Sequence, residues 1–301
     1  MSVIDVKGIQ KHFGEVKALR NVDLSVNKGE IYGFIGPNGA GKSTTIRILL
    51  GLLQADAGEA RIFEQDVWED AVSIHKRIAY VPGDVNLWPN LTGGEVIDLF
   101  LSMRGVTVDQ EKKHELMKRF NFDPSKKCRT YSKGNRQKVA LIAAFSADAE
   151  VYILDEPTSG LDPLMERVFQ ECVFEARDRG CSVLLSSHIL SEVERLCDRV
   201  AIIRDGEIIE SGSLKDLRHL TRVQLLVETK KEIPDLANQT GVYDLAEENG
   251  TYRFQVDTDQ LDVLIRYVSE FGVIKLESAP PTLEDLFMRH YEDNPDKGED
   301  S

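Results

Sequence analysis

The chain has 301 residues, of which 42% are hydrophobic, and its formal net charge is -14. This length suits one large domain, or a domain of about 200 residues followed by a smaller one. No apolar run approaches the roughly 18 residues that a membrane-spanning helix needs, and the first residues lack the basic and then apolar layout of a signal peptide. The composition therefore excludes an integral membrane protein and predicts a soluble protein of the cytoplasm.

The negative charge is concentrated towards the carboxyl terminus. From residue 219 onward there are 8 Lys and Arg residues against 18 Asp and Glu residues. This shift predicts a domain boundary near residue 219 and argues against nucleic acid or an anionic lipid surface as a partner of that part. Residues 292–301 are acidic and have no apolar anchor, which predicts a disordered tail. The four cysteines form no CxxC pair, so we expect reduced, mostly buried thiols rather than a zinc site or a disulfide framework.

The first thirty residues indicate two short strands, 3–9 and 22–26, with Phe13 between them. Two interpretations of Phe13 are open. An aromatic ring at this place is either part of an ordinary core or the flat apolar surface on which a nucleobase stacks. The second interpretation requires a nucleotide site nearby.

A glycine-rich segment follows a third apolar run and precedes an amphipathic one. Its glycines let the backbone curl, so that successive N–H groups point at phosphate oxygens. Lys42 adds a positive charge for the β and γ phosphates, Ser43 offers a hydroxyl to Mg²⁺, and the following helix directs the positive end of its dipole to the same place. Beside such a loop, Phe13 is predicted to stack on adenine. The predicted phosphate-binding residues are Gly36, Pro37, Asn38, Gly39, Ala40, Gly41, Lys42, Ser43 and Thr44.

After the helix of this loop the pattern predicts a strand over 59–63 and a buried strand over 78–81, which ends at Pro82 and Gly83. The next stretch is more helical, and Thr92 with Glu95 has the spacing of a capping box. It interrupts the alternation of strands and helices. We therefore expect a separate helical lobe over about residues 84–147.

Within that lobe a small polar loop, which contains Ser132 and Gly134, precedes a helix predicted over 139–146. A loop of this kind at the start of a helix is a second potential phosphate site, because the helix dipole and free N–H groups attract anions. The same residues are also typical of an ordinary helix cap. The residues alone leave both interpretations open.

Two further buried strands end in polar residues. The strand over 151–154 is followed by Asp155 and Glu156, and ligands collect at the carboxyl ends of such strands. Asp155 is predicted to hold Mg²⁺, directly or through a water, and Glu156 to accept a proton from an attacking water. The strand over 182–185 leads to His188, which can reach a γ-phosphate and exchange hydrogen-bond roles there.

These motifs, in this order, resemble those of the ATP-binding cassette (ABC) family over residues 1–218. In that family GPNGAGKST is the Walker A loop, ILDEP the Walker B strand with its catalytic glutamate, SGLD the D-loop, here with Asp162, and SSH the switch histidine. The resemblance implies an α/β phosphate-loop NTPase fold with a RecA-like core, a β-subdomain and a helical subdomain. It also implies an ATPase that uses ATP and Mg²⁺, with Ser43 and Asp155 as metal ligands.

The YSKGN segment looks like the signature loop of the family. Such a loop closes over the nucleotide of a second cassette, so the resemblance implies a homodimer in which Ser132, Gly134 and Asn135 complete the partner's site. The family signature reads LSGGQ, and the variant found here, with a lysine at position 133, is similar to that of exporter-type cassettes. A larger departure is Gly83, where the family places a glutamine that touches Mg²⁺ and the transmembrane partner. Asp84 or a water is the candidate substitute.

Residues 219–291 show a different pattern. Predicted strands at 223–228, 242–246, 252–256 and 273–276, with helices at 233–240 and 260–271, give the order β-α-β-β-α-β of a small ferredoxin-like α+β domain. A last helix is predicted over 282–287. A similar domain follows the cassette in subunits of drug, antibiotic and lipid exporters whose permease is a separate chain. We expect it to dock on the partner subunit; the alternative is that it only stabilises its own cassette.

The resemblance therefore implies the ATP-hydrolysing subunit of a membrane exporter, held at the cytoplasmic face of the cell membrane by a separate integral membrane permease, with no nucleic acid partner. The alternative is a non-transport ATP-gated clamp, or a regulatory nucleotide-binding module with weak hydrolysis. Gly83 keeps the weak-hydrolysis version open. The cargo is not encoded here, because cargo contacts in such systems lie in the permease.

Overall fold

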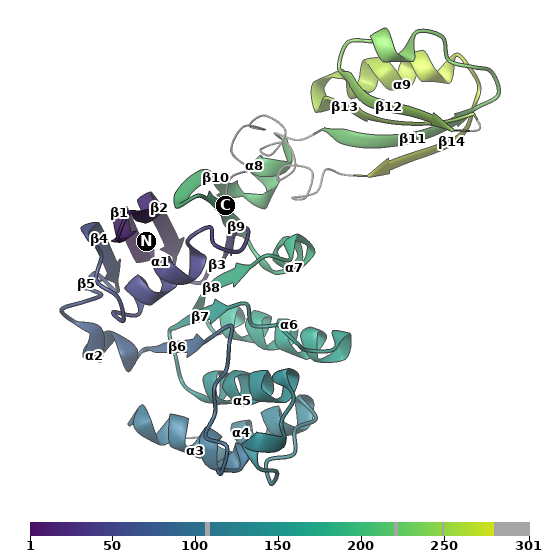
Figure 1. Ribbon diagram of the computed structural model, residues 1–301. Coiled ribbons are helices and arrows are strands. Elements are labelled where there is room, and N and C mark those ends of the chain that lie inside the picture. The colour runs from purple at the N-terminus through teal and green to yellow at the C-terminus, as the bar shows by residue number, and fades with distance from the viewer. Residues whose placement is uncertain (106–108, 220–221, 249, 280–301) are drawn as a thin grey trace. The chain divides into compact units, whose positions relative to one another are not determined.

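The computed structural model describes residues 1–105, 109–219, 222–248 and 250–279 (Figure 1). The chain forms two compact units, unit 1 (Met1–Gly212) and unit 2 (Ser213–Ser301). The division falls a few residues before the boundary expected near 219. In the part of the chain that the structure describes, no helix combines the length and the apolar character needed to cross a membrane.

Unit 1 is built on a ten-stranded sheet with the order β5-β4-β1-β2-β10-β9-β3-β8-β7-β6. Strands β1, β2, β4 and β5 pair antiparallel, whereas β6, β7, β8, β3 and β9 form a parallel half. The strands are β1 (Ser2–Phe13), β2 (Val16–Asn27), β3 (Ile31–Ile35), β4 (Ala57–Ile62), β5 (Gln65–Asp66), β6 (Ile78–Val81), β7 (Val151–Asp155), β8 (Ser182–Ser187), β9 (Arg199–Arg204) and β10 (Glu207–Ser213).

The parallel half explains why the apolar runs are continuous. Every residue of β3, β7 and β8 is buried, as expected for parallel strands that are covered on both faces. Because the strands run in one direction, their carboxyl ends share an edge of the sheet. The register there aligns Ile35 with Ser187 and Asp155 with Ser186. The polar residues that follow these strands are thereby brought together.

The helices of unit 1 are α1 (Lys42–Leu49), α2 (Ala71–His75), α3 (Gly93–Met103), α4 (Gln110–Arg119), α5 (Lys133–Ser146), α6 (Pro163–Asp178) and α7 (Leu190–Leu196), with a 3-10 turn η1 (Cys128–Thr130). Helices α3 and α4 each pack on α5, and the three lie together at the lower end of unit 1 in Figure 1. The predicted capping box is confirmed: Thr92 Oγ1 accepts from the amide of Glu95 at 3.2 Å, and Glu95 Oε2 accepts from the amide of Thr92 at 2.6 Å.

Helix α5 begins six residues earlier than predicted, at Lys133 instead of residue 139. Ser132 is its N-cap, and the Ser132 hydroxyl accepts from the amide of Asn135 at 3.3 Å. This cap satisfies one of the free N–H groups of the first turn, which lets the helix include Gly134. Further along, Phe145 stacks on Tyr152 with ring centroids 5.2 Å apart. The four cysteines of the chain are free and buried, as predicted.

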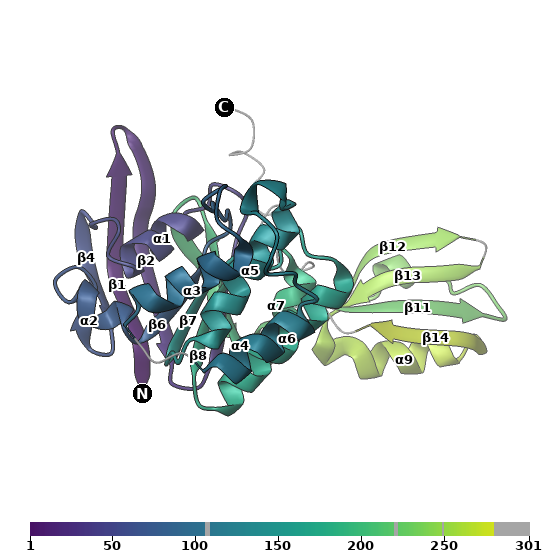
Figure 2. The same ribbon diagram turned by 90° about the horizontal axis from the view of Figure 1, so that it is seen from below.

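Unit 2 contains a four-stranded antiparallel sheet with the order β12-β13-β11-β14. The first strand lies between the third and the fourth, which is the split βαβ arrangement, and α9 lies along one face (Figure 2). The predicted ferredoxin-like class is confirmed. Its elements are α8 (Leu214–His219), β11 (Val223–Thr229), η2 (Leu236–Asn238), β12 (Val242–Glu248), β13 (Thr251–Val256), η3 (Thr258–Gln260), α9 (Leu261–Ser269) and β14 (Val273–Ala279).

The prediction of a helix over 233–240 was wrong, because only the 3-10 turn η2 forms there. Pro234 lacks an N–H group, and Asp235 has a left-handed backbone with φ of 54°. The segment is fixed instead by tertiary contacts: the amide of Ile233 donates to Tyr252 Oη at 3.1 Å, and Tyr267 Oη donates to the carbonyl of Pro234 at 2.5 Å. The helix predicted over 282–287 and the acidic tail over 292–301 lie outside the described residues.

Candidate active site

The predicted phosphate loop joins the carboxyl end of β3 to α1 in a close-packed path. A Cβ atom at Gly36 would lie 2.3 Å from the carbonyl oxygen of Ile203, and one at Gly41 would lie 2.6 Å from Leu19 Cδ2. Gly41 also has φ of 112°, which L side chains rarely adopt. Among the described side chains none caps α1. The N–H groups of its first turn are therefore donors that suit a phosphate.

Lys42 lies buried inside this loop, with 6% of its surface exposed. Its Nζ donates to the carbonyl oxygens of Gly36 at 2.5 Å and Pro37 at 3.2 Å. The same Nζ lies 3.6 Å from Glu156 Oε1 at the end of β7. The ammonium group is thus held at the mouth of the loop, facing the predicted catalytic carboxylate.

The two predicted metal ligands meet directly. Ser43 Oγ donates to Asp155 Oδ2 at 3.1 Å, and the other carboxylate oxygen, Oδ1, accepts from Ser186 Oγ. In the described residues no group of three or more His, Cys, Asp or Glu side chains could hold a metal ion. Mg²⁺ commonly takes only one or two protein oxygens and completes its shell with phosphate and water. The hydroxyl and carboxylate oxygens present here fit an ion of that kind.

Glu156 and His188 form the second close pair at this edge. His188 Nδ1 lies 2.5 Å from Glu156 Oε2, and the two side chains are 53% and 20% exposed, respectively. Glu156 adopts a left-handed backbone with φ of 47°, and its amide donates to the carbonyl of Ser186 at 3.0 Å. A non-glycine residue in that region costs of the order of 1–3 kcal/mol, and such strain is concentrated at active sites. The strained turn directs the carboxylate towards both Lys42 and His188.

Phe13 ends β1 and is 49% exposed, so it is not a core side chain. It pairs with Val16 at the start of β2, and Leu19 further along β2 packs on Gly41 of the phosphate loop. Lys11 Nζ lies 5.8 Å from the centre of the Phe13 ring. The ring is thus presented to solvent by the hairpin that packs on the phosphate loop.

The predicted signature loop and D-loop lie side by side. A Cβ atom at Gly134 would lie 2.3 Å from the carbonyl oxygen of Gly160, and Lys133 Nζ donates to Ser159 Oγ at 2.6 Å. Asp162 caps α6 and accepts from two backbone amides at 3.0 Å. Of the hydrogen bonds and ion pairs in the described residues, none joins Ser132, Gly134 or Asn135 to the phosphate loop. The pairing of Lys133 with Ser159 had no signal in the sequence.

Gly83, which stands where the resemblance implies a glutamine, lies against the catalytic strand. A Cβ atom there would lie 3.2 Å from the carbonyl oxygen of Asp155 and 3.3 Å from Glu156 Cβ. Asp84 is exposed, and its Oδ2 accepts from Asn86 at 3.5 Å. The carbonyl of Pro82 accepts a hydrogen bond from the side-chain amide of the buried residue Gln137 on α5, at 3.4 Å. This segment is therefore linked to the helical lobe through a backbone carbonyl.

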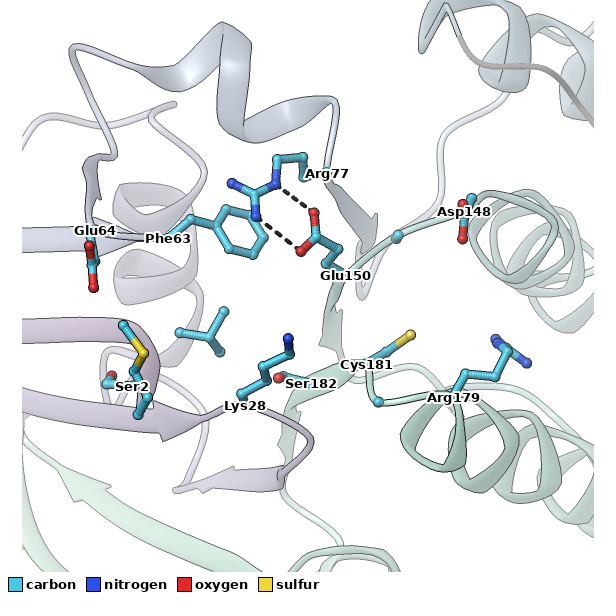
Figure 3. A pocket seen from close by; sticks show the side chains of 14 residues that line it. Ser2, Lys28, Phe63, Glu64, Arg77, Asp148, Glu150, Arg179, Cys181 and Ser182 are labelled. Atoms are coloured by element: carbon cyan, nitrogen blue, oxygen red, sulfur yellow. Dashed lines mark hydrogen bonds and ion pairs between the residues drawn. The ribbon is translucent and has the colours of Figure 1, made fainter.

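A cavity of about 670 Å³ lies elsewhere in unit 1 (Figure 3). Its lining includes residues that precede β6, β7 and β8, so it opens at the amino edge of the parallel strands, away from the phosphate loop. The guanidinium of Arg77 stacks 3.5 Å above the Phe63 ring and donates to both oxygens of Glu150, at 2.6 and 3.0 Å. This hydrogen-bonded pair raises the pKa of Arg77 and lowers that of Glu150. The cationic side chains of the wall are matched in number by its anionic ones, which does not suit a triphosphate; they are Lys28, Arg77 and Arg179 against Glu64, Asp148 and Glu150.

Comparison with known proteins agrees with this geometry. Residues 19–159 match the family described as ABC transporter, and residues 212–291 match that described as ATP-binding protein DrrA1-3-like, C-terminal domain. The uncharacterized ABC transporter ATP-binding protein YdbJ of Bacillus subtilis is 33% identical, over 99% of this chain and 98% of its own. The daunorubicin resistance ATP-binding protein DrrA3 of Streptomyces coeruleorubidus is 31% identical, over 95% of each chain.

Solved structures show the same fold for the cassette part. A structure described as the ATP binding subunit of an ABC transporter is 32% identical, with a TM-score of 0.68 over 73% of this chain and 93% of the other. The dimeric cassette MJ0796 is 26% identical, with a TM-score of 0.63 over 70% of this chain and 98% of the other. A second dimeric structure of that cassette, in a post-hydrolysis state with ADP and Pi, has a TM-score of 0.64 at 25% identity. Matched along nearly its whole length, the chain belongs to the ABC transporter family as an ATP-binding subunit, an ATPase that serves transport.

Proposed function

We propose that the chain energises an exporter of drug, antibiotic or lipid-type cargo, as a homodimer that binds two ATP with Mg²⁺ and acts on a separately encoded permease. The observation that carries the catalytic part is the convergence of Lys42, Glu156 and His188 at one edge of the sheet, with separations of 3.6 and 2.5 Å. The direction of transport is supported by the match of residues 212–291 to a DrrA-like domain and by the relative named for daunorubicin resistance.

Nucleotide binding uses groups that are already aimed into the phosphate loop. The uncapped amides of α1 and the ammonium of Lys42 bind the phosphates, and Lys42 gives up the carbonyls of Gly36 and Pro37 in exchange. Ser43 and Asp155 would hold Mg²⁺, and the ion would supply positive charge that offsets the negative charge developing on the transferred phosphoryl group. Phe13 stacks on adenine from its hairpin.

Glu156 acts in the chemical step. When Lys42 turns to the phosphates, the ion pair with Glu156 Oε1 is released, and that oxygen becomes free to accept a proton from the attacking water. The water oxygen bonds to the γ-phosphorus as the bond to ADP breaks, which yields ADP and phosphate. His188 holds the other carboxylate oxygen through Nδ1 and so orients the base.

A second copy of the chain supplies the signature loop. Ser132, Gly134 and Asn135 make no hydrogen bond or ion pair to the phosphate loop within the described residues, which suits a role towards another chain. The helix α5 behind them begins at Lys133, so its positive end is available to a γ-phosphate across the dimer. The dimeric structures of MJ0796, a relative in fold, support the same assembly here.

A groove in unit 1 is our candidate for the surface that docks the permease. A cavity of about 580 Å³ lies between α1, α2, β6 and α3, and its rim exposes Leu52, Val72 and Met103 by 65%, 77% and 74%. Exposed apolar side chains gathered around a hollow mark an interaction site. A cytoplasmic helix of the permease would cover them and hold the subunit at the membrane. We further propose that unit 2 docks on the partner subunit.

The test is the substitution Glu156→Gln, which removes the proton acceptor and keeps the shape. Because general base catalysis contributes about 10² to 10⁴ in rate, we expect ATP turnover to fall by that factor while ATP affinity is kept. ATP should then trap a dimer that is visible by size-exclusion chromatography with light scattering. Glu69→Gln, an exposed acid outside the site, is the control.

Substantial residual hydrolysis in Glu156→Gln would contradict the assignment of the base. The transport part is tested separately, by purifying the tagged protein from native membranes and identifying what accompanies it by mass spectrometry. An integral membrane protein that co-purifies with Mg²⁺-dependent ATPase activity supports the exporter subunit. A ribosomal, DNA-bound or partnerless result would contradict it.

A further inference from the structure

Glu192 on α7 is a buried acid that the reaction above does not use. Its exposed fraction is 6%, and acids are rarely buried unless they are paired. Carboxylate oxygen Oε2 accepts from Ser187 Oγ at 2.8 Å. Oxygen Oε1 is buried and has no partner at hydrogen-bonding geometry among the described residues. An incompletely satisfied buried carboxyl calls for an explanation, because leaving such a group without partners costs free energy.

Oxygen Oε2 of Glu192 belongs to a hydrogen-bond network that involves the residues on both sides of His188. The Ser187 hydroxyl donates to Glu192 and accepts from the amide of Ile189 at 3.0 Å. Ser187 is 1% exposed and ends β8 opposite Ile35, the last residue before the phosphate loop. The residue before His188 is thereby bonded to the buried acid, and the residue after it is linked to that acid through the Ser187 hydroxyl. The His188 ring itself contacts Glu156.

The other side faces the turn that follows Glu156. Thr158 is 6% exposed and its hydroxyl lies near the Glu192 carboxyl, but no hydrogen bond of ordinary geometry joins the two in the described residues. Burial raises the pKa of the Glu192 carboxyl, and the Ser187 and Thr158 hydroxyls offset part of that rise. The backbone of Thr158 accepts from the amide of Leu161 at 2.9 Å, and the carbonyl of Glu156 accepts from the amide of Ser159 at 3.1 Å. Thr158 therefore belongs to the turn that fixes the backbone of Glu156.

We propose that Glu192 is a positioning residue for hydrolysis: it holds the Ser187 segment and the Thr158 turn together, and so sets the distance between His188 and Glu156. The proposal rests on the proposed function, because it assigns Glu192 to the same catalytic pair. Glu192 does not touch the nucleotide.

The first test compares Glu192→Ala with Glu192→Gln in the full-length protein. A displacement of 1 Å at a catalytic group costs about 10²-fold, so we expect Glu192→Ala to lower kcat by about tenfold to a hundredfold with little change in KM for ATP. Glutamine can accept from Ser187 with its carbonyl and donate to the Thr158 hydroxyl with its amide. Glu192→Gln should therefore keep most of the turnover. Arg195→Ala, at an exposed position of the same helix, is the matched control.

The second test separates positioning from mere support of the fold. If Glu192 acts through His188, then Glu192→Ala should lower single-turnover hydrolysis strongly in the wild type and little in a His188→Ala background, because residues that act as a unit are not additive. A loss of the same factor in both backgrounds would contradict the proposal. So would unchanged kcat in Glu192→Ala, or a loss in Glu192→Gln as large as that in Glu192→Ala.

If Glu192→Ala does not fold, Ser187→Ala and Thr158→Val each remove one side of the arrangement and leave the acid in place. Each should then lower kcat by a smaller factor at unchanged ATP affinity, and wild-type kcat in both would overturn the inference. The outcome is distinguishable from failure of the proposed function. A wild-type protein that hydrolyses ATP and is inactivated by Glu156→Gln, but is indifferent to Glu192, would refute this inference alone.

Discussion

The sheets of the two units place polar residues in opposite ways. In unit 1 the strands β3, β7 and β8 are buried throughout, and the reactive side chains come after the strands end. In unit 2 the sheet is antiparallel, and β12 and β14 are exposed along most of their length. Parallel strands bring their carboxyl ends to one edge, whereas antiparallel strands distribute them over both edges. The comparison shows why the chemistry gathers in unit 1 and why unit 2 offers a surface instead.

The largest expected effect comes from removing a large buried side chain from the core of either unit. Phe169 in unit 1 and Phe254 in unit 2 are 0% and 1% exposed. Replacing either by alanine should lower the free energy of unfolding of its own unit by about 3–5 kcal/mol, through lost burial and the cavity left behind. The comparison requires Phe169→Ala and Phe254→Ala to act independently.

The unfolding of unit 1 can be followed by labelling of its cysteines, because all four lie in that unit. Burial raises the pKa of the Cys172 thiol to about 12, so this thiol stays protonated and unreactive at pH 8 until unit 1 unfolds. Labelling by a thiol reagent in increasing urea should move to lower urea in Phe169→Ala. It should not move in Phe254→Ala, whose effect is read from the circular dichroism of the whole chain. A shift of labelling in both variants would show that the units unfold together.

A smaller effect concerns helix caps. In unit 1 the capping box of Thr92 and Glu95 satisfies the start of α3, whereas in unit 2 no side chain caps α9 at Gln260 in the part of the chain described. Thr92→Ala should lower the stability of unit 1 by about 1 kcal/mol, which is the usual cost of losing an N-cap. Gln260→Ala should leave unit 2 nearly unchanged. Urea midpoints of the two variants check this, and equal shifts would contradict the difference between the caps.

The smallest expected effect is the coupling free energy of an ion pair, and each unit contains one pair of a similar kind. Arg77 stacks on Phe63 and binds Glu150 in unit 1, and Arg222 stacks 3.1 Å above the Tyr243 ring and binds Asp257 at 3.2 Å in unit 2. A double-mutant cycle with Arg77→Met and Glu150→Gln should give a coupling of about 0.2–1 kcal/mol, because exposed pairs are screened by water and salt. We expect the Arg222 and Asp257 cycle to give a similar value.

The pH dependence of the first pair has a definite sign. The hydrogen bond from Arg77 lowers the pKa of Glu150 below its ordinary value of 4.5. The stabilisation is therefore present above pH 4.5 and is lost as the pH falls through the lowered pKa of the folded protein. A coupling that persists undiminished in acid, or that survives 1 M salt, would contradict this account.

The sequence predicted the parts of the site that use consecutive residues or a general rule of sheets. The phosphate loop is a local pattern, and the meeting of Asp155 and His188 with it follows from the shared edge of parallel strands. The fold class of unit 2 was predictable from the order of its strands. The helix expected over 233–240 failed because Pro234 and the left-handed Asp235 break it, and the periodicity of the apolar residues does not record that.

Contacts between side chains of different elements could not be predicted from the pattern of the sequence. The bond from Ser186 to Asp155 and that from Ser187 to Glu192 depend on how α7 docks and on individual rotamers. The same holds for Lys133 and Ser159, which are 26 positions apart. The only signal available was a pair of serines at the end of a buried strand, where apolar residues would be expected.

The contact between Gly134 and Gly160 has a consequence for the natural variation of this protein. Gly134 has no room for a side chain, since a Cβ atom there would meet the carbonyl oxygen of Gly160 at 2.3 Å, and Gly160 has a backbone φ of 81°, which L side chains rarely adopt. A substitution at either glycine is therefore disfavoured in a single chain, before any nucleotide or second copy is involved. Selection at these two sites acts on the folding of each protomer as well as on transport, so retention of both glycines in a descendant gene would not by itself prove that its product still hydrolyses ATP.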